Sequence, residues 1–168
     1  MKPTTKLVAL IAVMSALGNV LGFLAIKLPS TPGTTVEFHL SVLPSLLLAV
    51  SVGPLSGAIT GFLSLITATV QIGNVFIPFG NALFAAIAGL LANKFRFPPP
   101  VSGVVAVVPY APYMWFACSV YNVPQPVIAF IIVKAFFEIL ISSTIVEFML
   151  LRPEVRNFLS TLKVQSTT

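Results

Sequence analysis

Long apolar stretches alternate with short polar connections along the whole chain. Six stretches are recognisable, and they cover residues 7–26, 38–52, 54–70, 76–92, 101–121 and 127–151. A helix that crosses the hydrocarbon core of a bilayer needs about 20 mainly apolar residues, and about 17 at the least. The pattern therefore predicts an all-α membrane protein with a compact bundle of six transmembrane helices.

The connections between these stretches are short, and the second and third stretches meet at Gly53 and Pro54. Short connections place consecutive helices side by side and antiparallel. We therefore expect residues 1–168 to form a single transmembrane domain, in which the polar tail 152–168 forms a brief surface helix.

The composition indicates that lipid surrounds most of the chain. Of the 168 residues, 57% are hydrophobic and 8% are charged, whereas soluble domains carry about 25% charged residues. The formal charge of +5 could suggest a nucleic-acid partner, but the basic residues are scattered at the ends of the apolar stretches rather than gathered on one face. We expect no nucleic-acid partner.

Lysine and arginine also predict the orientation, because cytoplasmic loops carry an excess of both. If the amino terminus lies inside, Lys27 alone lies outside and Lys134 falls within a stretch, while the remaining basic residues are cytoplasmic: Lys2, Lys6, Lys94, Arg96, Arg152, Arg156 and Lys163. We therefore expect a multi-pass protein of the cell membrane with both termini cytoplasmic. The first stretch could also be a cleaved signal peptide, but its apolar run continues to Ile26, the length of a full span.

Several classes of chemistry lack their motifs. The chain has no GxxxxGK[ST] phosphate loop, no HExxH and no GxSxG. His39 is the only histidine and Cys118 the only cysteine, which excludes a histidine-rich metal site and an intrachain disulfide. We expect no enzymatic activity, no cofactor and no metal. If transport is driven by ATP, the ATPase is a separate polypeptide.

Lys134 and Glu138 are the costliest residues to place in lipid, about 12 and 18 Å below the outer boundary if the last stretch is helical. Charges at such a depth are candidates for function. One interpretation is contact with a ligand or ion. The other is a mutual ion pair, since a spacing of four residues puts both side chains on one helix face, although lysine before glutamate is the less favourable order. Glu147 lies near the inner end, where water is within reach.

The connection after the first stretch carries further polar candidates, Thr35, Glu37 and His39. Its prolines and glycine favour an ordered, lid-like turn, although a solvated connector has the same composition. A lone histidine favours a hydrogen-bonding residue at a helix end over a metal ligand.

Polar and aromatic residues also gather at the predicted outer ends of the later stretches: Asn74, Asn81, Tyr110, Tyr113, Trp115 and Asn122. Apolar walls with a few polar anchors are typical of a pocket for a small aromatic solute. The aromatic residues equally fit a belt at the membrane interface.

Small residues recur at a spacing of four, at Gly53, Gly57 and Gly61, and at Ala12 and Ala16. Such spacing lets helix backbones approach closely in lipid. For the glycines we expect contacts inside the bundle, whereas the first helix could present its small face to a partner chain.

Two runs, "LSVLPSLLLAVSVGPLSGAITGF" and "IPFGNALFAAIAGLLANK", resemble the substrate-binding membrane subunits, or S components, of energy-coupling factor (ECF) vitamin transporters. The resemblance implies six helices and capture of a small water-soluble vitamin outside, in a pocket formed by the first outer loop and the last three helices. It also implies that Ala12 and Ala16 dock a transmembrane coupling subunit, which works with two ATP-binding subunits. Riboflavin is the vitamin suggested by the look of the loop and the second stretch, whereas the lone histidine is unlike the cobalt and nickel branch.

Two other functions remain open. A scaffolding membrane protein would use the small-residue faces for assembly and bind no solute. A stand-alone proton-coupled carrier would use Glu138, but six helices without a visible internal repeat favour it less.

Overall fold

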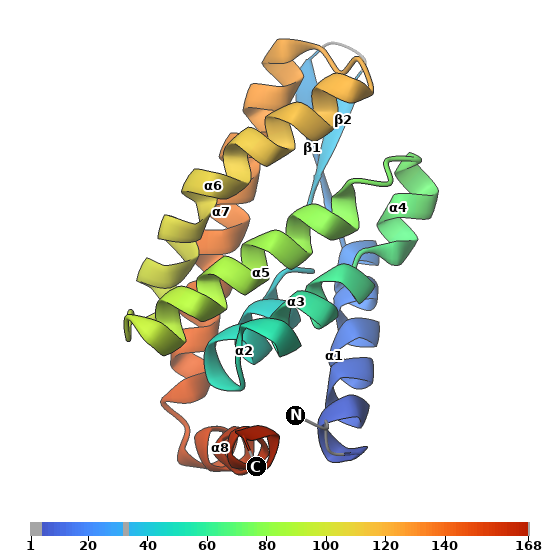
Figure 1. The fold of residues 1–168 in the computed structure, drawn as a ribbon. Helices are drawn as coiled ribbons and strands as arrows, with labels where there is room; N and C mark the ends of the chain where they lie inside the picture. The colour runs from blue at the N-terminus through green and yellow to red at the C-terminus, as the bar shows by residue number, and fades with distance from the viewer. Residues whose placement is uncertain (1–4, 32–33, 168) are drawn as a thin grey trace.

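The computed structural model describes residues 5–31 and 34–167 as a bundle of apolar helices (Figure 1). Lys2 lies outside the described residues, as does the side chain of Lys163. The helices are α1 (Thr5–Phe23), α2 (Leu43–Ser51), α3 (Pro54–Leu63), α4 (Ile66–Ile72), α5 (Ile77–Lys94), α6 (Pro99–Val120), α7 (Gln125–Leu150) and α8 (Pro153–Thr167).

A β-hairpin lies at one end of the bundle, near the connection between α6 and α7, while α8 and the first turn of α1 lie at the opposite end (Figure 1). Strands β1 (Ile26–Thr31) and β2 (Thr34–Phe38) pair antiparallel, with Ile26 opposite Phe38. The connection after α1 is thus ordered. The prediction of an all-α fold was wrong at this point, because threonine and β-branched residues here favour strand pairing.

The predicted second span, residues 38–52, was wrong as a single long helix. Phe38 ends β2, and α2 has nine residues, which span about 14 Å of a core about 30 Å thick. Pro44 lies in the first turn of α2, where its fixed φ and missing N–H are tolerated. Gly53, with φ of 154°, ends the helix in a conformation that other residues rarely adopt.

Five helical stretches of the described residues are long and apolar enough to cross a membrane: Thr5–Phe23, Pro54–Ile72, Ile77–Lys94, Pro99–Val120 and Gln125–Leu150. The second of these combines α3 and α4. Six full-length helical spans are therefore not confirmed. The tail forms a helix, α8, which buries Leu159 and Leu162 and so packs against the bundle.

The short helix α2 forms the centre of the core. Its residues Leu46, Leu47, Leu48 and Ala49 are at most 2% exposed, and they cluster with Phe84, Ala85 and Ala88 of α5 and with Ile139 and Val146 of α7. Because lipid tails are as apolar as leucine, such contacts stabilise the bundle through close packing rather than through removal from water.

The glycine stripe of α3 supplies that close packing. A Cβ on Gly57 would collide with Ala49 of α2, and one on Gly61 would lie 2.9 Å from the backbone oxygen of Asn81 in α5. Gly57 and Gly61 are therefore used inside the bundle, as predicted, whereas a Cβ on Gly53 would meet nothing within 4 Å. Ala12 and Ala16 differ, since both are exposed on α1.

The span made by α3 and α4 is interrupted at Ser64 and Leu65, and Asn19 of α1 closes the interruption. Asn19 Nδ2 donates to the oxygen of Leu63 at 2.8 Å, and Asn19 Oδ1 accepts from the backbone N–H and hydroxyl of Thr67 at 3.2 and 2.6 Å. One amide thus pairs a carbonyl at the end of α3 and an N–H at the start of α4, groups that a broken helix leaves without partners.

We expect Asn19→Leu to lower the free energy of unfolding by about 1–3 kcal/mol, because it leaves polar groups of the helix break unpaired in an apolar setting. Thermal unfolding of the detergent-purified variant measures the loss. Val13→Leu, at an exposed position of the same helix, is the control and should unfold like the native chain. Equal melting temperatures for both variants would contradict the role of Asn19.

Candidate functional site

A cavity of about 460 Å³ lies between β2, α4 and the hairpin-side halves of α5, α6 and α7. Its walls include apolar residues from every one of these helices, among them Ile72, Ile77, Met114 and Ile131. The polar residues of the lining are Thr35, Glu37, His39, Ser64, Thr67, Gln71, Asn74, Asn81, Tyr110, Cys118, Lys134 and Glu138. An apolar enclosure with scattered polar groups is the usual form of a site for a small organic molecule.

Lys134 and Glu138 of α7 form an ion pair in the lining of this cavity. Lys134 Nζ lies 2.9 Å from Glu138 Oε2, and the two side chains are 10% and 3% exposed. The structure thus supports the mutual ion pair. Both residues also line the cavity.

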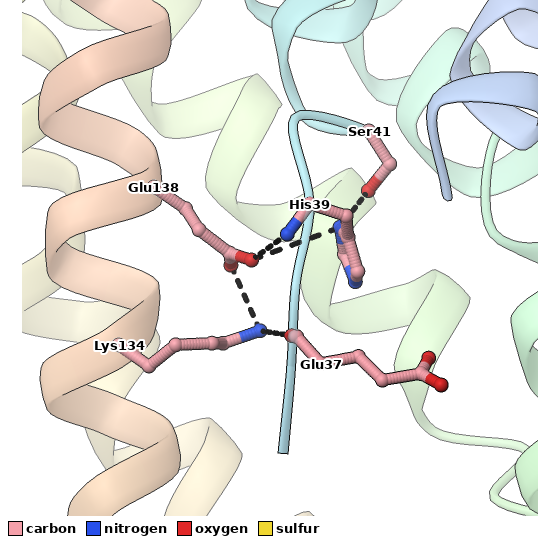
Figure 2. Close-up of polar contacts among 5 residues, drawn as sticks. All are labelled: Glu37, His39, Ser41, Lys134 and Glu138. Carbon is pink, nitrogen blue, oxygen red and sulfur yellow. Dashed lines mark hydrogen bonds and ion pairs between the residues drawn. The ribbon is translucent and has the colours of Figure 1, made fainter. Parts of the chain in front are cut away.

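The ion pair is completed by the backbone of the segment that leaves the hairpin, as Figure 2 shows. Lys134 Nζ donates to the backbone oxygen of Glu37 at 2.8 Å, and the backbone N–H of His39 donates to Glu138 Oε1 at 2.6 Å. The carboxylate of Glu37 points away from both charged groups. Two charges of α7 therefore fix the path of residues 37–39.

His39 precedes α2 and lies next to Glu138, with 3.8 Å between His39 Nδ1 and Glu138 Oε1. Nδ1 lies 2.8 Å from the hydroxyl oxygen of Ser41 at the start of the core.

The structure brings eight of the predicted site residues to the cavity: Thr35, Glu37, His39, Asn74, Asn81, Tyr110, Lys134 and Glu138. Tyr113, Trp115 and Asn122 lie elsewhere. The Tyr113 hydroxyl donates to the backbone oxygen of Phe76 at 2.8 Å, Trp115 is 40% exposed, and Asn122 is an exposed turn residue with φ of 54°.

Sequence reasoning missed Met114 and Cys118 on α6, and Thr67 and Gln71 on α4. The residues on α6 follow Tyr110 at steps of four, so they share its helix face, and this spacing was a usable signal. Thr67 and Gln71 of α4 had no such signal in the sequence, because their position depends on the break before Ile66. Among the described residues, no three His, Cys, Asp or Glu side chains are grouped so as to hold a metal ion.

Most of the chain is similar to a solved structure of the S component of a bacterial ECF transporter. The TM-score is 0.66 and the sequence identity 23%, and the match covers 92% of this chain and 97% of the other. No protein-family model matches the chain, and no curated protein does. The protein therefore has the fold of an ECF transporter S component, as its sequence predicts.

Proposed function

We propose that the chain is the substrate-binding subunit of an ATP-driven ECF importer, and that its cavity takes a small water-soluble vitamin or related micronutrient. One observation carries the proposal: in an S-component fold, the cavity lies beside the hairpin and holds buried charged and amide groups. Its volume of about 460 Å³ suits a ligand of vitamin size. Riboflavin is one candidate.

The proposed orientation puts both termini in the cytoplasm and the hairpin outside. Support comes from Lys6 in the first turn of α1 and from Arg152 and Arg156 beside and in α8, since that turn and α8 lie at the end opposite the hairpin (Figure 1). The chain then crosses the membrane six times, and its second crossing combines residues 39–42 with the short α2. This arrangement opens the substrate cavity toward the outside.

Transport requires partners in this proposal, because the chain carries no ATP-binding motif. Ala12 and Ala16 are exposed on one side of α1, and small residues at this spacing permit close contact with another helix. They dock the transmembrane coupling subunit, and two ATP-binding subunits supply the energy. Neither alternative, the scaffold nor the proton-coupled carrier, has a specific observation in its favour, and the carboxylate of Glu138 is already paired.

A substrate should stabilise the purified chain. In a thermal unfolding assay across a panel of water-soluble vitamins, the substrate at 100 times its dissociation constant should add about 2.7 kcal/mol. Ala68→Trp, which fills the cavity from α4, should abolish the effect, whereas Val70→Trp, on the exposed side of the same helix, should preserve it. No response to any vitamin, or equal responses of the two variants, would refute the proposal.

Docking can be measured separately by co-purification with the coupling subunit and the two ATP-binding subunits. We expect Ala12→Trp and Ala16→Trp each to reduce assembly at least tenfold, because a bulky side chain prevents close helix contact, while vitamin binding is unchanged. Val108→Trp, at a position of α6 that is 73% exposed, is the control. Full assembly of both alanine variants would show that α1 is not the docking face.

A further inference from the structure

The charged groups of the cavity are unevenly balanced. Among the described residues that line it, Lys134 is the one cation, and Glu37 and Glu138 are carboxylates. With histidine counted as neutral in the formal charge, one ammonium against two carboxylates leaves the lining with a formal charge of −1.

The single cation already has two partners within the protein. Lys134 Nζ contacts Glu138 Oε2 at 2.9 Å and the backbone oxygen of Glu37 at 2.8 Å. An anionic ligand that recruited Lys134 would leave the buried carboxylate of Glu138 without its counter-charge, which is strongly unfavourable. An anionic ligand that left the pair intact would still meet a lining with one more carboxylate than ammonium. Both routes penalise a negative charge.

A neutral ligand meets neither penalty, and polar groups of the lining remain available to it. Asn81 is not one of them, because its Nδ2 donates to the backbone oxygen of Gly61 at 3.0 Å. Its Oδ1 has no hydrogen-bond partner among the described residues, but it has almost no accessible surface.

Two other polar side chains of the lining are available. The hydroxyl of Tyr110 and the Nδ2 of Asn74 make no hydrogen bond within the described part of the chain, although Asn74 Oδ1 accepts from Phe76 N at 3.0 Å. The cavity therefore offers hydrogen-bonding groups to a neutral ligand with amide-like or heterocyclic edges.

We propose that the cavity selects substrates without net negative charge. This inference rests on the proposed function and narrows its substrate class. The charge balance of the lining is the specificity determinant, and the ion pair excludes carboxylate and phosphate forms of otherwise suitable molecules.

Matched pairs of compounds test the charge rule by titration calorimetry on the purified full chain. Suitable pairs are nicotinamide and nicotinate, panthenol and pantothenate, biotinamide and biotin, and riboflavin and its 5′-phosphate. The first three differ little in size, so they separate charge from bulk. In every pair that binds, we expect the anionic member to bind at least tenfold more weakly. Equal or tighter binding of the anionic member would overturn the inference while leaving the proposed function intact. Failure of all eight compounds and the remaining vitamins to bind would overturn both.

Variants of the two carboxylates test the charge balance directly. Glu138→Gln should release Lys134 and reduce the discrimination within a pair at least tenfold. Glu37→Gln, on the hairpin, should reduce it in the same direction, and it provides the test if Glu138→Gln does not fold. An unchanged ratio in a folded carboxylate variant would contradict the assignment.

Discussion

Two opposite charges buried on one face of α7 constrain the whole hairpin side of the molecule. A charge deep in a membrane protein requires a partner, and Lys134 and Glu138 supply each other's. Their remaining hydrogen-bonding capacity is directed at the backbone of Glu37 and His39, so residues 37–39 are held against α7. This contact closes one side of the cavity and leads the chain into α2 at the centre of the core (Figure 2).

The sequence predicted the parts of the fold that depend on composition and period. Long apolar runs became α1, α5, α6 and α7, and the glycines of α3 pack inside the bundle. The sequence did not predict the length of α2 or the break before Ile66. A short apolar run such as residues 38–52 does not distinguish a span from a strand followed by a buried helix, and the break is closed by Asn19, a residue 44 positions away from Leu63.

The site residues also divide into those that the sequence predicts and those that depend on helix packing. Lys134 and Glu138 were found because charge in an apolar run is conspicuous, and Asn74, Asn81 and Tyr110 because polar groups gather near one end of the bundle. Tyr113 and Trp115 failed as cavity residues, since the phase of α6 turns Tyr113 toward the backbone of Phe76 and Trp115 toward the outer surface. Helix phase is set by packing between helices, here where Gly80 of α5 admits the ring of Tyr113, and local sequence does not encode it.

The central claim of the proposal is that the cavity opens to the external medium and holds the substrate. Cys118, the only cysteine of the chain, is 5% exposed and lines this cavity, so it reports on the claim without any substitution. A membrane-impermeant thiol reagent applied to intact cells should modify Cys118 from outside, and the substrate should slow the reaction at least tenfold. Modification only after the membrane is permeabilised, or a rate unaffected by every vitamin, would contradict the account.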